Sequence, residues 1–184
     1  MNPTKVIAVV SGGMDSVTLA YLLYSEGYEL HLLSMNYGQR YRKEIGYAER
    51  CAERLVSSFN IADISSVGGL LSGSALTDQD FGVPVGHYTA ENMVVTVVTN
   101  RNAIILSIAY GVAVARGAQV DAAAVHAGDH YVNPDCRPGF IEAFDRMQRE
   151  AVEGFVDPSL CLYAPFVHKT KAEKVEIGAA LGVP

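Results

Sequence analysis

The stretch Val6-Ile-Ala-Val-Val10-Ser11-Gly-Gly-Met-Asp-Ser16 decides the fold of this 184-residue chain. Its first five residues are apolar and mostly β-branched, which predicts a strand buried on both faces. Gly12 and Gly13 permit a tight turn and let the backbone approach a ligand closely. From residue 15 to residue 24 apolar side chains recur at helical spacing, and Asp15 or Ser16 is placed to cap the first turn. A strand, a glycine turn and a helix start in this order predict an anion site.

The composition is that of an ordinary globular domain, with 49% hydrophobic and 18% charged residues, and it suits one domain over residues 1–184. A net charge of −6 argues against a general nucleic-acid-binding surface, although one local anion site remains compatible with it. The sequence shows no signal peptide and no apolar run of transmembrane length. We therefore expect a cytoplasmic protein with neither a membrane nor a nucleic acid as partner.

Three scattered cysteines, Cys51, Cys136 and Cys161, form no C-x-x-C pair. They indicate neither a disulfide framework nor a zinc site.

The patterning along the rest of the chain alternates between strands and helices. Strands are predicted over 6–10, 29–35, 61–65, 119–125 and 159–164, and helices over 15–24, 41–59, 100–116, 137–154 and 169–181. Residues 67–92 show no periodicity, which is typical of a functional or mobile segment. This order predicts an α/β fold, a three-layer doubly wound sheet of five parallel strands. The loops 11–16, 36–42 and 126–137 each follow a strand, so we expect them to open on one rim, where such folds bind ligands.

The glycine turn has its own signature, S-G-G-x-D-S. It is neither a Walker A motif nor G-x-G-x-x-G. It resembles the pyrophosphate loop of ATP pyrophosphatases, which split ATP between the α and β phosphates. The alternative is an ordinary glycine turn with a Ser or Asp helix cap, which occurs in many α/β proteins.

Five blocks together carry a more specific resemblance. They are residues 11–16, residues 36–45, Arg101-Asn102, Gly128-Asp129 with Asn133-Pro-Asp-Cys-Arg-Pro138, and Lys171-Ala-Glu173. With them the chain resembles the 7-cyano-7-deazaguanine synthases of the queuosine pathway. The resemblance implies an adenine-nucleotide α-hydrolase-like fold and an ATP-dependent ligase. Its substrates are 7-carboxy-7-deazaguanine and ammonia, and adenylated acid and amide intermediates lead to the nitrile.

The chain departs from the family pattern in two places. Family members continue into a cysteine-rich tail that holds zinc, whereas this sequence ends at Pro184 without such cysteines. Asn133 stands where a Tyr or a similar residue is expected. We therefore expect ATP and Mg²⁺ as cofactors, no zinc, and association into a homodimer.

The resemblance implies a nucleotide site around the glycine turn. Its members are Val10, Ser11, Gly12, Gly13, Met14, Asp15, Ser16, Val17, Thr18, Met35, Tyr37, Gln39 and Arg101. Backbone N–H and hydroxyl groups hold the phosphates, while Asp15 caps the helix or holds Mg²⁺. Arg101 stabilises charge on the α-phosphate, and Lys171 joins Arg101 and Asp15 as the third catalytic residue. Tyr37 is equally compatible with ordinary packing at the rim.

The acceptor site is expected along the later loops. Its members are Arg40, His126, Gly128, Asp129, Tyr131, Asp135, Cys136, Arg137 and Phe140. Asp129 or Asp135 accepts hydrogen bonds from the base, and Arg137 pairs with the substrate carboxylate in a fork. Residues 126–136 include metal-ligand types, but Gly128 and Pro134 predict a loop, where an H-x-x-x-H pair does not converge. Cys136 as a covalent nucleophile stays open, although nothing requires one when AMP leaves.

Two other functions also stay open. A related pyrophosphatase-loop enzyme would stop at the amide, 7-amido-7-deazaguanine. A nucleotide-binding module of the universal-stress type would share the sheet order without catalysis.

Overall fold

Five parallel strands form the central sheet, in the order β3-β2-β1-β4-β5. The computed structural model describes residues 3–38, 43–68, 70, 100–126, 128 and 133–184. The strands are β1 (Lys5–Val9), β2 (Glu29–Asn36), β3 (Ser58–Asp63), β4 (Val120–Ala122) and β5 (Cys161–Tyr163). Val6 of β1 pairs with Leu30 on one side and with Val120 on the other. The prediction of a parallel five-stranded α/β fold is confirmed.

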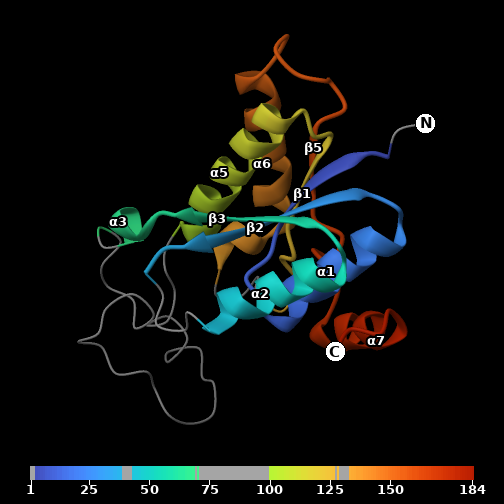
Figure 1. The fold of residues 1–184 in the computed structure, drawn as a ribbon. Coiled ribbons are helices and arrows are strands. Elements are labelled where there is room, and N and C mark those ends of the chain that lie inside the picture. The colour runs from blue at the N-terminus through green and yellow to red at the C-terminus, as the bar shows by residue number, and fades with distance from the viewer. Residues whose placement is uncertain (1–2, 39–42, 69, 71–99, 127, 129–132) are drawn as a thin grey trace.

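Helices cover both faces of the sheet, which makes three layers (Figure 1). One side carries α1 (Met14–Ser25) and α2 (Lys43–Arg54), with α7 (Lys171–Ala180) packed against α1. The other side carries α5 (Arg101–Arg116) and α6 (Pro138–Ala151). Two short pieces complete the described elements, α3 (Ser65–Gly68) and the 3₁₀ turn η2 (Pro134–Cys136). No helix in these ranges is both long enough and apolar enough to span a membrane.

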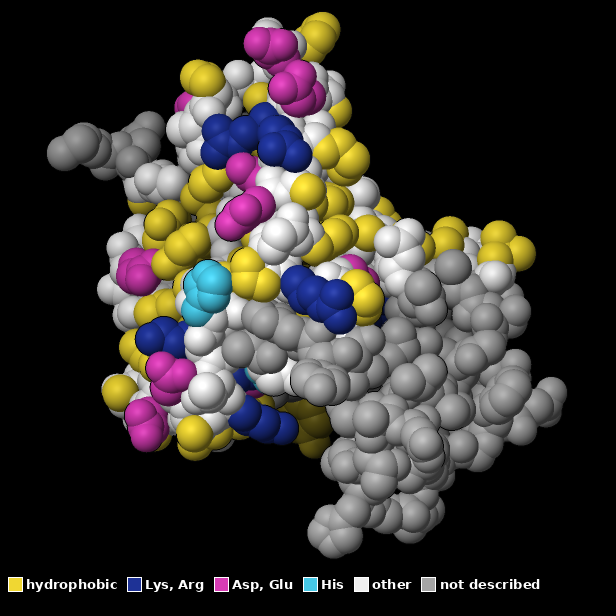
Figure 2. Space-filling view, turned by 180° about the vertical axis from the view of Figure 1, so that it is seen from behind, with side chains coloured by type: hydrophobic (Ala, Val, Ile, Leu, Met, Phe, Trp, Pro, Cys, Tyr) yellow, Lys and Arg dark blue, Asp and Glu magenta, His cyan; other side chains and the backbone are white. Residues whose placement is uncertain are grey.

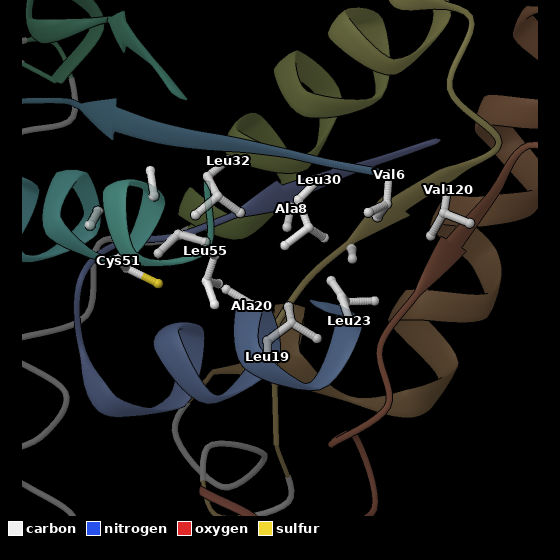
Figure 3. Close-up of a cluster of buried hydrophobic side chains, with 14 of the residues drawn as sticks. Val6, Ala8, Leu19, Ala20, Leu23, Leu30, Leu32, Cys51, Leu55 and Val120 are labelled. Carbon is white, nitrogen blue, oxygen red and sulfur yellow. The ribbon is translucent and has the colours of Figure 1, made fainter. Parts of the chain in front are cut away.

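The alternation of side chains along β1 divides the core in two. Val6 and Ala8 face α1 and α2, where Leu19 and Leu23 of α1 point toward them (Figure 3). Ile7 packs on the opposite side with α5 and α6. All three strand residues are almost fully buried. The predicted burial of this strand on both faces is confirmed, because helices cover both sides of a parallel sheet.

The predicted boundary between the second helix and the third strand is wrong. The helix was expected over 41–59 and the strand over 61–65, but α2 ends at Arg54 and β3 runs from Ser58 to Asp63. Val56 adopts a positive φ of 50°, and the N–H of Ser57 donates to the carbonyl of Ala52 at 3.0 Å, which closes the helix. The other predicted elements are present, with ends that differ from the prediction by at most three residues.

A buried carboxyl group lies in the middle of β4. Asp121 is completely buried, and within the described part of the chain neither side-chain oxygen has a hydrogen-bond partner. Burial raises its pKa well above the usual value, and the charge of Asp145 raises it further. The same desolvation raises the pKa of nearby Tyr110 to about 12.

Replacement of this carboxyl group should stabilise the protein in a pH-dependent way. A raised pKa means that the native state keeps a proton that the unfolded state releases above about pH 4, so stability falls as the pH rises. Asp121→Asn removes this titration. We expect its free energy of unfolding to exceed the wild-type value at pH 8 and the difference to shrink toward pH 4. Urea unfolding across this range measures it, with exposed Glu29→Gln as the control. Equal stabilities at pH 8 would contradict the prediction.

Candidate functional site

A cavity of about 340 Å³ opens at the carboxyl ends of β1, β2 and β4. Its described lining residues are Val9, Ser11, Gly13, Met14, Asp15, Ser16, Tyr37, Glu44, Arg101, Asn102, Ile105, Leu106, Ala123, Ala124, Val125, Asn133 and Cys136. The sheet reverses its strand order between β1 and β4, and ligands in α/β folds bind at this point. The described residues of the segments after β1, β2 and β4 meet on one rim, as predicted from the sequence. The volume is typical of a small-molecule site.

The glycine turn is held by its own hydroxyl groups. The N–H of Ser11 donates to Oγ of Ser16 at 3.2 Å, and the Ser16 hydroxyl donates to the carbonyl of Gly13 at 2.9 Å. Gly13 itself is the N-cap of α1, and no side chain caps this helix. The prediction that Asp15 or Ser16 caps α1 is therefore wrong, because Ser16 points back into the turn and Asp15 into an ion pair. The first N–H groups of α1 have no intrahelical acceptor, which suits them to an anion.

The two glycines of the turn meet different constraints. Gly12 has a φ of 91°, and a Cβ atom there would lie 1.9 Å from the carbonyl oxygen of Glu44 in α2. Gly13 has extended backbone, and its nearest neighbour to an added Cβ would be Oγ of Ser11 at 3.5 Å. Gly12 therefore allows α2 to pack over the turn. Gly13 leaves space on the cavity side.

A buried ion pair joins the turn to the last helix. Nζ of Lys174 lies 2.5 Å from Oδ1 of Asp15, and the lysine side chain is fully buried while Asp15 is 31% exposed. Oδ2 of Asp15 lies 3.4 Å from Nε2 of His126. Nδ1 of His126 accepts from the N–H of Gly128 at 3.0 Å, so Nε2 carries the ring hydrogen that faces Asp15.

The sequence did not predict the part that Lys174 plays behind this site, nor the place of Glu44 and Asn102 in the cavity wall. Lys174 shares one helical face with Ile177, Gly178 and Leu181, at positions i, i+3, i+4 and i+7. A lysine among small and apolar residues on such a face was the available signal for a buried charge. Lys171, the lysine of this region that the sequence predicts to be catalytic, is exposed at the first residue of α7.

On the opposite wall, the P-D-C turn is attached to the start of α5. Oδ2 of Asp135 accepts from the backbone N–H of Asn102 at 2.9 Å. The Asn102 amide donates to Sγ of buried Cys136 at 3.0 Å. Arg101 borders the cavity beside them, with its guanidinium 6.0 Å from the centre of the Tyr37 ring, the outer limit of a cation–π contact. Asp135 thus supplies the cap that α5 lacks from its own sequence.

Other predicted site residues lie behind the cavity wall or on the surface. Val10, Thr18 and Met35 are buried in the core, and Val17 packs partly buried against it and borders a different cavity. Phe140 packs against Phe144 with ring centres 5.7 Å apart, and Arg137 is exposed at the start of α6. Gln39, Arg40, Asp129 and Tyr131 lie outside the described residues. The binding roles of all of these residues stay predictions.

Metal binding at the site rests on few carboxylates. Within the described ranges no three His, Cys, Asp or Glu side chains gather as a metal cluster. Asp15 and Glu44 are the acidic residues of the described cavity wall. Mg²⁺ needs only one or two protein carboxylates when phosphate oxygens and water complete its shell, and Mg²⁺ binding by Asp15 stays a prediction. The expectation of no zinc stays a prediction.

On the molecular surface, acidic and basic side chains are interspersed with apolar ones across the described part of one face (Figure 2). They are not sorted by sign into a basic stripe there. This distribution agrees with a local anion site in a chain of net charge −6.

Comparison with known proteins identifies the family to which this chain belongs. The family described as queuosine biosynthesis protein QueC matches residues 5–184. The chain belongs to the QueC family. Two relatives named 7-cyano-7-deazaguanine synthase are close to this QueC chain. The protein from Brucella anthropi is 54% identical and that from Rhizobium johnstonii 55% identical, each over 180 residues. The matched region covers 98% of this chain and 76% and 75% of those proteins, respectively.

Solved structures with low sequence identity share the fold of this QueC chain. The U34-tRNA thiolase NcsA from Methanococcus maripaludis aligns with a TM-score of 0.58 at 14% identity, over all of this chain and 59% of that one. The NH₃-dependent NAD synthetase from Campylobacter jejuni aligns with a TM-score of 0.59 at 16% identity, over all of this chain and 66% of that one. Both support the adenine-nucleotide α-hydrolase-like fold that the resemblance implied.

The two glycines provide a matched test of the turn. Gly12→Ala should lower the free energy of unfolding by about 2 kcal/mol or more, because of the positive φ and the clash with Glu44. Gly13→Ala should keep nearly wild-type stability but weaken pyrophosphate binding about tenfold, since its methyl group occupies the anion site. Thermal unfolding and calorimetric titration separate the two effects. Equal behaviour of both variants would show that the constraints are wrongly assigned.

Proposed function

We propose that this chain is an ATP-dependent ligase that converts 7-carboxy-7-deazaguanine and ammonia to 7-cyano-7-deazaguanine. One observation carries the proposal. The chain shares 54% identity over 98% of its length with a relative of this name. The anion-binding turn at the switch point of the sheet supports ATP as the activating substrate.

The reaction needs two activations of one carbon atom. A carboxylate oxygen of the substrate attacks the α-phosphorus of ATP, and pyrophosphate leaves. Ammonia then displaces AMP from the acyl adenylate and, after loss of a proton, gives the amide. The amide oxygen attacks a second ATP, pyrophosphate leaves again, and loss of AMP with the remaining nitrogen-bound protons gives the nitrile. Each step forms or breaks a bond at phosphorus or at the carboxyl carbon, so no redox partner is needed.

The cavity wall provides groups for the first half of this chemistry. The first turn of α1, at residues 13–16, directs N–H groups at the β and γ phosphates. Arg101 on the opposite wall stabilises the charge that grows on the α-phosphate oxygens. Mg²⁺ that arrives with ATP would screen the phosphate charge, with Glu44 as its protein carboxylate, because Lys174 and His126 engage both oxygens of Asp15. Lys171 keeps its predicted catalytic role within this proposal.

The acceptor base belongs to the segment that follows β4. Of the two carboxylates predicted to bind the base, Asp135 already accepts from the backbone of α5. We therefore assign hydrogen bonding to the base to Asp129, with Arg137 on the substrate carboxylate. Asp135 keeps the turn and the start of α5 together.

This division predicts different outcomes for two variants. Asp129→Asn should retain ATP affinity and lose affinity for the 7-carboxy base by about tenfold, because an acceptor becomes a donor. Asp135→Ala removes the cap of α5, so we expect about 1 kcal/mol less stability and weaker binding of ATP near Arg101. Titration of both ligands against both variants tests this. If Asp135→Ala lost affinity for the base and kept its ATP affinity, Asp135 and not Asp129 would be the residue that contacts the base.

The alternatives are less well supported. An enzyme that stops at the amide, or a nucleotide-binding module without catalysis, does not correspond to the names of the relatives at 53–55% identity. The cytoplasmic location and the homodimer belong to this proposal as expectations from the sequence. Sedimentation of the purified chain tests the dimer.

The mass of the product tests the central claim. The protein is incubated with ATP, Mg²⁺, ammonium and 7-carboxy-7-deazaguanine, and products are followed by mass spectrometry. We expect the nitrile, with two ATP consumed per product and the amide as a transient. Accumulation of the amide would favour the shorter reaction. No pyrophosphate release with any 7-deazaguanine acid would favour the binding module.

A further inference from the structure

Lys174 is fully buried in α7 and reaches the nucleotide turn through Asp15. Apart from its 2.5 Å ion pair with Oδ1 of Asp15, the described residues offer Nζ no hydrogen-bond partner, and the same holds for Oδ1 itself. Transfer of an ammonium group out of water is costly unless a partner charge offsets it. Among the described residues, Asp15 is therefore the partner that offsets the buried charge of Lys174.

Asp15 is the residue of the turn whose charge opposes the proposed ligand. It lies in the first turn of α1 and lines the cavity, where the helix dipole and free N–H groups favour an anion. An uncompensated carboxylate at this point would compete with phosphate for the same N–H groups and repel it through a medium of low dielectric constant. A binding site for polyphosphate therefore needs this charge balanced.

We propose that Lys174 is a positioning residue that neutralises Asp15 and holds its carboxylate out of the polyphosphate site, so that the turn accepts a pyrophosphate group before any metal arrives. The inference rests on the proposed function only in taking pyrophosphate as the group bound at the turn. Lys174 does not line the cavity, so it acts through Asp15 rather than on the ligand.

The contacts around Asp15 support this role. Oδ1 is held by Lys174, while Oδ2 faces Nε2 of His126 at 3.4 Å, so partners engage the carboxylate on both oxygens. His126 is in turn held by the N–H of Gly128. The orientation of Asp15 is therefore determined by α7 and by the segment after β4, and not by the turn alone.

A purely structural role for Lys174 is the competing explanation. Helix α7 already packs closely on α1 at another point, where a Cβ atom on Gly178 would lie 3.0 Å from Oγ1 of Thr18. If Lys174 only fastened the two helices, its removal would loosen α1, and a second change at Asp15 would not repair the loss. If it balances charge, removal of the carboxylate as well should restore binding.

A double-variant cycle distinguishes these roles. Pyrophosphate affinity is measured by calorimetry in EDTA for the wild type, Lys174→Met, Asp15→Asn and the double variant Asp15→Asn/Lys174→Met. We expect Lys174→Met to weaken binding about tenfold and the double variant to bind within about threefold of the wild type. Lys5→Met is the charge-matched control, since Lys5 is exposed at the opposite end of β1, and it should bind as the wild type does.

Any other result contradicts either the positioning role of Lys174 or the proposed function. Unchanged affinity in Lys174→Met, or a double variant no better than Lys174→Met, overturns the positioning role. Wild-type binding that appears only with Mg²⁺ also overturns it, because Lys174 then does not supply the compensation. A wild-type protein that binds neither pyrophosphate nor ATP under any condition refutes the proposed function instead. If Lys174→Met does not fold, Lys174→Gln with and without Asp15→Asn provides the same comparison.

Discussion

The approach of α2 to the glycine turn is the constraint on which the site depends. The carbonyl oxygen of Glu44 occupies the position that a side chain on residue 12 would need. Because the turn packs closely beneath α2, the helix α1 can begin directly after the central strand β1. The N–H groups of α1 then meet the cavity instead of the solvent-exposed edge. The absence of a side chain at Gly12 therefore determines both how α2 packs and where the first N–H groups of α1 lie.

The fold could be predicted from the sequence because its signals are local. Val6 to Val10 indicate a strand by their β-branched apolar run, and the residues after Gly13 indicate a helix by their spacing. The parallel order follows from the alternation of strands and helices along the chain. The boundary at residues 55–61 could not be predicted in this way. Phe59 and Ile61 continue an apolar pattern compatible with either element, and the positive φ of Val56 arises from the closure of α2 on Ser57.

The candidate site was predicted less completely, for a different physical reason. Residues close in sequence to a motif, such as Ser11, Arg101 and Cys136, were found at the cavity as expected. The contact of Lys174 with Asp15 was not predicted, because it forms only after α7 packs on α1 and excludes water from the lysine side chain. The sequence predicted a contact of Asp135 with the base, and it gave no sign of the hydrogen bond that Asp135 accepts from the backbone of α5. The spacing of residues along the sequence does not show which side chains become buried or which distant residues they contact.

The contact between the P-D-C turn and α5 has a consequence for engineering. Asp135 and Cys136 both bond to Asn102, so the segment that follows β4 carries the cap of a helix that begins more than thirty residues before it. Transplantation of this segment from a relative with a different acceptor would remove the cap unless the first turn of α5 came with it. The two walls of the cavity are therefore structurally coupled in this scaffold, and libraries that vary one wall should vary the other in register.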